Sequence, residues 1–167
     1  LNYTAGRDEA VAIFYYGDGA KAAEGKYISR KKEGLWKFWS ATQPHYLICE
    51  EFYDNDIRNG LSKKYFADSV LAEKVVWDLG NRSGEWLQYY PDGSICLRAE
   101  FMAGKLEGPM SYYHPNGKLQ YEGKYHDDLR TGDWMVFNED GTLKQIITYR
   151  DGVPADPKLA DMETKFL

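Results

Sequence analysis

The side chains best suited to chemistry gather near residue 126. His126, Asp127 and Asp128 are consecutive and carry the nitrogen and oxygen atoms that bind metals or move protons. The other histidines, His45 and His114, lie elsewhere, and no His-x-x-x-His or Cys-x-x-Cys spacing occurs. The sequence also has no Gly-x-Ser-x-Gly nucleophile motif and no phosphate-binding loop. We therefore predict a polar turn here, with no catalytic residue, no metal and no cofactor.

Charge and hydropathy narrow the classes of partner. The 167 residues carry a formal net charge of −5, which argues against nucleic acid as the main partner. The basic run Arg30-Lys31-Lys32 is shorter than the 4–8 basic residues that usually recruit anionic lipid. We interpret it as a solvated turn and do not favour a membrane partner. No apolar run approaches the roughly 18 residues that a membrane-spanning helix needs.

A repeat of about 24 residues organises the chain. Glycines at 34, 60, 84, 108 and 132 mark copy starts, and a first start is assigned to Ala10. Two aromatic columns follow the same period, one five residues after each start and one seven residues before it. The first column contains Tyr15, Trp39, Tyr65, Tyr89, Tyr113 and Phe137, and the second contains Tyr27, Tyr53, Trp77, Phe101, Tyr125 and Tyr149.

Each copy is predicted to be a β-hairpin. Turn signals such as Pro91-Asp92-Gly93 and Pro115-Asn116-Gly117 separate runs of about 8–12 residues. The second strand of a copy alternates, with Leu119, Tyr121, Gly123 and Tyr125 on one side. The first strand is apolar at both parities, which a bulge or burial on both faces would explain. The prediction is an all-β, elongated antiparallel array of about six hairpins.

Small residues occur two positions before the second column in several copies. Gly25, Ala99 and Gly123 are examples, and a large neighbour is expected to lie over such a position. The candidates on the first strands are Trp36, Trp86 and Trp134. The cysteines, Cys49 and Cys96, fall two copies apart, or about 20 Å at two strands per copy. A disulfide needs Cα atoms within about 7 Å, so two free thiols are predicted.

The two ends depart from the repeat. Residues 1–9 are interpreted as the remnant of a preceding repeat, because Tyr3 lies seven residues before Ala10 and so belongs to the second column. Residues 10–155 are assigned to the six repeats. Residues 156–167 are predicted to form a short helix that caps the last hairpin, with Asp156 as N-cap and Pro157 after it; a frayed tail is the alternative. The compartment stays open between the cytoplasm and export after removal of an N-terminal segment.

Two sets of aromatic side chains are candidates for binding. A column present in every copy is what packing requires, so both columns are interpreted as structural ladders rather than stacking platforms. The residues directly after the first column vary between copies and are expected to point outward beside the turns. They form the candidate binding strip Tyr16, Phe66, Tyr90 and His114, for which local turn packing is the alternative.

The motifs resemble a known family. Gly84-x-Trp86-x-x-Tyr89-Tyr90-Pro91-Asp92-Gly93 and Tyr121-x-Gly123-Lys124-Tyr125-x-Asp127 are similar to the MORN repeat (membrane occupation and recognition nexus) in its bacterial variant form. The resemblance covers about residues 3 to 155 and is closest in the last three copies. It implies a hairpin per repeat and no catalytic residue. Bacterial chains made only of this variant resemble a putative antitoxin family, which implies a protein partner.

Three functions remain open at this level. The first is a non-enzymatic module that binds an unidentified protein partner, in an antitoxin-like role if the family resemblance extends to function. The second is a surface module for lipid or glycan. The third is a structural spacer without a ligand.

Overall fold

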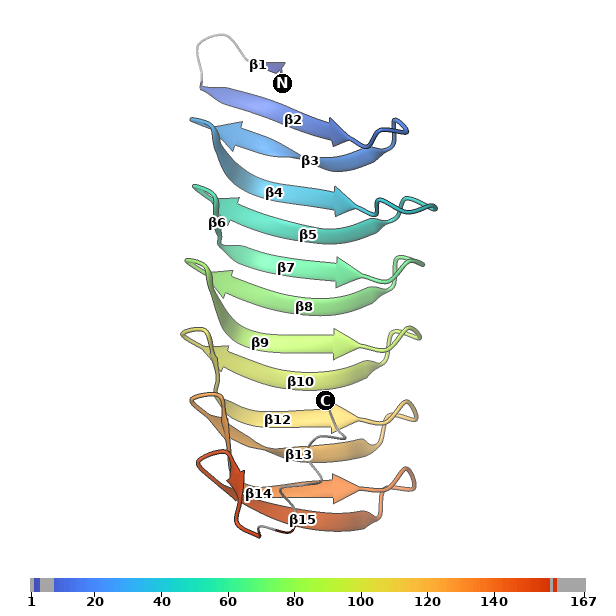
Figure 1. Ribbon diagram of the computed structural model, residues 1–167, viewed down its shortest axis with the longest axis vertical. Helices are drawn as coiled ribbons and strands as arrows, with labels where there is room; N and C mark the ends of the chain where they lie inside the picture. Colours follow the sequence, from blue (N-terminus) through green and yellow to red (C-terminus); the bar gives the residue numbers. More distant parts are fainter. Residues whose placement is uncertain (1, 4–7, 157, 159–167) are drawn as a thin grey trace. The chain divides into compact units, whose positions relative to one another are not determined.

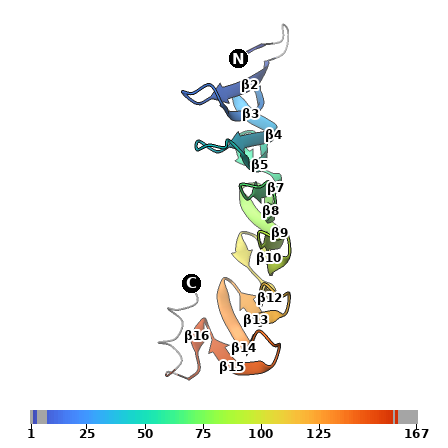
Figure 2. The ribbon, with the colours of Figure 1, turned by 90° about the vertical axis from the view of Figure 1, so that its right-hand side faces the viewer.

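The computed structural model describes residues 2–3, 8–156 and 158, and it is an array of antiparallel β-hairpins (Figure 1). The all-β hairpin-array prediction is therefore confirmed. Contacts within the chain define two compact units, residues 1–83 with 91–93, and residues 84–90 with 94–167. Each unit contains three hairpins, which follow one another in sequence order (Figure 2).

The strands of the first unit are β1 (Asn2–Tyr3), β2 (Glu9–Tyr15), β3 (Lys21–Ile28), β4 (Lys31–Trp39), β5 (Leu47–Asp54), β6 (Ile57–Arg58), β7 (Gly60–Tyr65) and β8 (Leu71–Asp78). Those of the second are β9 (Asn81–Tyr89), β10 (Ile95–Met102), β11 (Lys105–Leu106), β12 (Gly108–Tyr113), β13 (Leu119–His126), β14 (Leu129–Phe137), β15 (Leu143–Arg150) and β16 (Val153–Pro154). The first three residues of β9 are assigned to the first unit. The hairpins are β2–β3, β4–β5, β7–β8, β9–β10, β12–β13 and β14–β15.

Two-residue turns connect the hairpins along one edge of each unit. Asn55 and Asp56 both have positive φ, 52° and 70°, which is the type I′ geometry that matches strand twist. The amide of Asp56 donates to the carbonyl of Lys32 in 3.1 Å, and the Asp56 carboxylate accepts from the Lys32 amide in 2.7 Å. Asp128 makes the same pair of bonds with Leu106 in the second unit. The backbone and the carboxylate of one Asp thus tie each of these turns to the strand that begins after the preceding turn.

A β-bulge lies next to the first aromatic column in the hairpins. The pairing shifts register immediately before Tyr15, Trp39, Tyr65, Tyr113 and Phe137. The extra residue of this bulge is on the second strand, as Ala22 is between Lys21 and Ala23. The first strands β4 and β14 carry extra residues where they pair with the preceding hairpin, opposite Glu24–Lys26 and Glu122–Lys124. In these two strands the structure shows the bulge, one of the two explanations left open for apolar residues at both parities.

Tryptophan packs on glycine in both units, as the small positions predict. A Cβ built on Gly25 would lie 2.2 Å from Trp36 Cδ2, and one on Gly123 would lie 2.2 Å from Trp134 Cδ2. Each indole N–H donates to the backbone carbonyl after the glycine, at Lys26 or Lys124, in 3.2 Å. Trp36 and Trp134 expose only 1% and 3% of their surface. The glycine thus leaves room on the face of the sheet for a nearly buried indole in each unit.

The predictions for the two ends fall partly on undescribed residues. β1 pairs with β2, with Tyr3 opposite Ala10, but residues 4–7 lie outside the described residues. Pro157 and residues 159–167 also lie outside them, so the capping helix and the domain boundaries stay predictions.

Candidate interaction surfaces

The predicted binding strip lies along the turn edge, where it connects hairpins. Tyr16 donates its hydroxyl to the carbonyl of Trp39 in 2.6 Å. Tyr90 donates in the same way to the carbonyl of Tyr113. His114, 9% exposed, has Nε2 at 3.2 Å from the carbonyl of Phe137. Phe66 is half-buried at the equivalent place. These contacts favour the alternative of turn packing, and ligand binding by the strip remains an untested prediction.

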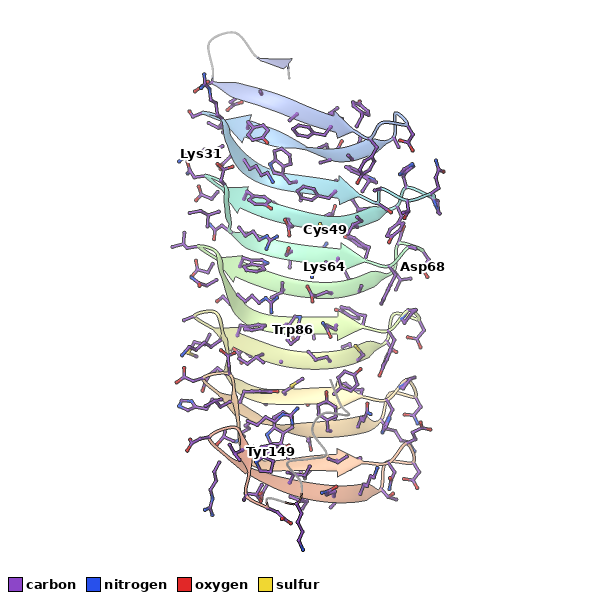
Figure 3. All side chains as sticks on the ribbon, in the orientation of Figure 1. Lys31, Cys49, Lys64, Asp68, Trp86 and Tyr149 are labelled. Carbon is purple, nitrogen blue, oxygen red and sulfur yellow. The ribbon has the colours of Figure 1, made fainter. Side chains whose placement is uncertain are left out.

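The second aromatic column defines one face of the sheet in each unit, here called the column face. Figure 3 labels Cys49, Lys64, Trp86 and Tyr149, which lie on it. Tyr27 meets Trp36 edge-on with ring centroids 5.0 Å apart, and Tyr125 meets Trp134 at 5.2 Å. Both geometries are favourable aromatic pairings. The contacts support a structural role for this column.

Cations lie over the column rings, a feature that the sequence interpretation missed. Lys32 Nζ is 4.8 Å from the ring centre of Tyr53 and 4.9 Å from that of Trp36. Arg58 Cζ lies 5.0 Å from the ring of Trp77. The basic run around Lys32 is therefore only partly a solvated turn, because Arg30 and Lys31 are exposed while Lys32 packs on aromatic rings. The sequence contained a signal for these cations. A basic residue occurs two residues before four of the copy starts, at Lys32, Arg58, Arg82 and Arg130.

Both cysteines are free, as predicted, and neither is set up as a nucleophile. Burial, with the nearby charge of Glu51, raises the pKa of Cys49 to about 11. Burial also raises the pKa of the Cys96 thiol. Because the thiolate is the reactive form, both thiols stay protonated near neutral pH.

The inserted turn after β4 contains a histidine held between two acceptors. His45 Nδ1 lies 2.7 Å from the carbonyl oxygen of Ser40, and Nε2 lies 2.9 Å from the Asp18 carboxylate. The ring also stacks on Tyr16 at 5.8 Å. The Ser40 carbonyl and then Asp18 raise the pKa of His45 against the opposing effect of burial. The protonated imidazole satisfies both contacts.

The contribution of His45 to stability should be lost as pH rises. A raised folded-state pKa means that the protonated contacts stabilise fully below the ordinary value of 6.5, and that this is lost on passing through the higher folded-state pKa. We expect an NMR titration of the His45 ring to give a midpoint above 6.5, and Asp18→Asn to lower it. The titration of His126, which pairs with Glu107 at 3.0 Å, should be unchanged in that variant. A wild-type midpoint at or below 6.5 would contradict this.

The opposite face of the first unit exposes an ordered set of apolar side chains. Strand register places five of them on this face: Val11, Ile13, Leu35, Phe52 and Val76, exposed by 59, 44, 38, 41 and 38%. Leu35 lies directly opposite Phe52, and Leu61 lies directly opposite Val76. Glu24 and Lys26 of β3 lie on this face between Ile13 and Leu35. Exposed apolar side chains that gather on one face are typical of interaction sites. We call these five residues with Leu61 the apolar row.

A row of charges borders the apolar row on the same face. Glu24 pairs with Lys37, Lys37 with Glu50, Glu50 with Lys63, and Lys63 with Lys74 in the strand register. Lys37 and Glu50 form an ion pair of 3.5 Å. Lys63 and Lys74 are like charges on directly opposite residues, an arrangement that costs stability in a sheet. An acidic group from outside would relieve that repulsion.

The second unit has mostly charged or polar residues at the repeat positions of Val11, Leu35, Phe52, Leu61 and Val76, whereas at the position of Ile13 it has Leu87, Ser111 and Met135. One residue after the copy starts it has Glu85, Pro109 and Asp133, where the first unit has Val11, Leu35 and Leu61. One residue before the second aromatic column it has Glu100, Lys124 and Thr148, where the first unit has Lys26, Phe52 and Val76. Since the strands form the same hairpins in both units, the fold does not require apolar residues at these positions.

The second unit has a cavity of about 260 Å³ on its column face. Tyr121, Trp134, Ile147 and Tyr149 supply apolar walls, and Arg130 and Lys144 supply positive charge; the described lining also includes the acid Glu139. Arg130 stacks on Trp134 at 4.9 Å, and its Nη1 donates to the Tyr149 hydroxyl in 3.1 Å. The cavity therefore suits an apolar group next to an acidic one.

Neither a metal centre nor a membrane span emerges from the described residues. Within them, no group of three or more His, Cys, Asp or Glu side chains is placed to hold a metal ion. Among the same residues, none belongs to a helix long and apolar enough to cross a membrane.

An array of hairpins with packed aromatic columns defines the class of β-hairpin repeat proteins. Residues 82–102, 106–127 and 130–151 each match the family model of the MORN repeat variant. Residues 82–151 thus contain three MORN variant repeats, and MORN repeats are generally modules for protein or membrane interaction. A comparison with curated proteins finds no match.

Proposed function

We propose that the chain is a non-enzymatic module that binds a protein partner through the apolar row of its first unit. The supporting observation is that Phe52 and Val76 are exposed at a repeat position where the second unit has Glu100, Lys124 and Thr148. The hairpins of the second unit form without large apolar residues at the positions of Leu35, Phe52 and Val76, so a bound partner accounts for the exposure of these side chains. Burying them on binding would contribute about 25 cal/mol for each Å² of apolar surface.

The lysines that border the apolar row indicate the charge of the partner surface. An acidic side chain from the partner would lie between Lys63 and Lys74, beside the apolar row. The partner surface is thus an apolar patch flanked by carboxylates. An antitoxin-like role is one form of this proposal, in which the partner is a toxin protein that the chain covers.

Substitution within the apolar row should abolish partner binding. We expect Phe52→Asp to reduce capture of the partner from a lysate of the source organism at least tenfold, because a carboxylate would lie in the apolar contact. The matched control is Lys124→Asp, at the same repeat position in the second unit, which should capture the partner as the wild type does. Equal capture by wild type and Phe52→Asp would overturn the apolar row as the binding site.

A membrane surface is the second candidate, which the lysines beside the apolar row favour. It predicts binding to vesicles of phosphatidylserine and phosphatidylcholine that weakens steeply with salt. Protein capture that persists at moderate salt, with no binding to these vesicles, supports the protein partner. Vesicle binding that Phe52→Asp abolishes would move the function to a lipid surface.

A further inference from the structure

Four residues of the apolar row lie on four neighbouring strands of the first unit (Figure 1). Leu35 on β4 lies directly opposite Phe52 on β5, and Leu61 on β7 lies directly opposite Val76 on β8. Because β5 pairs with β7, the four side chains follow one another at the spacing of neighbouring strands, about 4.8 Å. This central part of the row is therefore about 14 Å long and runs across the strands.

Charges of opposite sign border the central part of the row on its two sides. Lys63 and Lys74 lie on one side and Asp54 and Asp78 on the other, each two residues along a strand from a member of the row. Alternate residues of a strand share a face, so all four charges are on the face of the row. The two sides are about 13 Å apart along a strand. An α-helix with its side chains is about 10–12 Å wide and fits between them.

The length of the central part distinguishes a helix from an extended chain. Apolar residues at positions i, i+3, i+7 and i+10 of a helix span about 15 Å. Four alternate residues of an extended segment span about 20 Å, which is too long for a row of about 14 Å. Along each strand the row is one residue wide, so an apolar stripe can follow it only across the strands. A helix that places its apolar stripe on an apolar surface is a common form of recognition.

We propose that the partner presents an amphipathic α-helix, which lies across β4, β5, β7 and β8 of the first unit. Its apolar stripe contacts the central part of the row, its carboxylates face Lys63 and Lys74, and its basic side chains face Asp54 and Asp78. The carboxylates relieve the repulsion between the two opposite lysines. This inference rests on the proposed function and adds the form and the charge pattern of the partner element.

Synthetic peptides test the helix without the natural partner. The helical peptide has about 18 residues, with leucine at the stripe positions, glutamate on one flank, lysine on the other and alanine elsewhere. The comparison peptide has the same composition with its leucines at alternate positions, which is the period of a strand. We expect fluorescence anisotropy with the purified full chain to show at least tenfold tighter binding of the helical peptide. Equal affinities, or no binding of the helical peptide, would overturn the proposal.

Substitutions in the chain locate the bound peptide. Phe52→Asp should weaken binding of the helical peptide at least tenfold, and Lys124→Asp, at the same repeat position in the second unit, should leave it unchanged. Equal binding by the wild type and Phe52→Asp would count against the proposal. If Phe52→Asp abolishes capture of the partner but the helical peptide does not bind, the protein-binding function stands and the helix is wrong. Equal capture would instead overturn the proposed function.

Reversal of the acidic side tests whether the helix lies between the two sets of charges. A third peptide has the same leucines and glutamate on both flanks. The wild type should prefer the helical peptide, and Asp54→Lys with Asp78→Lys should reverse that preference; both aspartates are exposed, so the hairpins stay intact. The control for total charge is Glu85→Lys with Glu100→Lys, an opposite pair in the second unit, which should keep the wild-type preference. An unchanged preference in the first-unit variant would overturn the proposal.

Discussion

Gly123→Ala should destabilise the second unit by about 2–3 kcal/mol, the upper part of the range for overpacking a well-filled site. The new methyl group would lie 2.2 Å from Trp134 Cδ2, and the indole cannot retreat easily because its N–H is bonded to the Lys124 carbonyl. Whether the substitution lowers or raises the stability of the unit shows whether the indole fills the space beside Gly123. Gly123 has no positive φ, so without the indole the substitution would stabilise by about 0.4–1 kcal/mol. Urea denaturation followed by circular dichroism measures the difference.

The chain contains its own compensation for this substitution. One repeat earlier, the equivalent residues are Ala99 and Met110, both buried in the same core. Gly123→Ala combined with Trp134→Met reproduces that pair. We expect the double variant to be at least 1 kcal/mol more stable than the sum of the single effects predicts, because the smaller side chain leaves room for the methyl. Strictly additive effects would show that the two residues do not share the space.

The packing of tryptophan on glycine was within reach of the sequence because it depends on size and period alone. Small residues at a fixed place in the repeat require a large neighbour, and Trp36 and Trp134 occupy that place. The hairpins followed from turn signals and alternation for the same reason. The faces of the first strands did not follow, because a bulge is set by register and leaves no fixed residue type.

The surfaces were harder to predict, for two physical reasons. The residue type at the strip position varies between copies, which suggested ligand binding. However, Tyr16, Tyr90 and His114 all reach the backbone carbonyl of the first-column residue one copy later. Predicting the apolar row from sequence requires two pieces of information. One is which alternate residues of each strand face away from the aromatic column, and the other is which residues occupy the equivalent positions in the two units. Val76 reads as an ordinary strand residue until Glu100 and Lys124 are seen at the same place.

Arg58→Ala should cost about 2–3 kcal/mol, although the Arg58 side chain is 43% exposed. The cost arises at Glu51, which occupies the repeat position of Gly25 and Gly123 and is only 8% exposed. Its carboxylate lies 3.0 Å from Arg58 Nη2 and accepts a hydrogen bond from the Tyr53 hydroxyl. Without the guanidinium, a nearly buried negative charge would lose its cation. Chemical denaturation measures the loss, and Arg98→Ala, at a half-exposed ion pair of 3.5 Å with Glu85, should cost less than about 1 kcal/mol.

Removing the charge separates the two ways in which Arg58 could stabilise the sheet. If the ion pair matters most, adding Glu51→Gln to Arg58→Ala should recover at least half of the lost stability, since a neutral amide is cheaper to bury than a carboxylate. If no stability returns, the loss comes from the stacking of Arg58 on Trp77 at 5.0 Å. The distinction matters for the repeat, because Glu51 and Ser62 occupy the places that Gly25 and Trp36 fill one copy earlier. Recovery of stability in the double variant would show that two kinds of contact can fill this place in the hairpin. One is a glycine covered by a tryptophan ring, and the other is a glutamate paired with an arginine of the neighbouring strand.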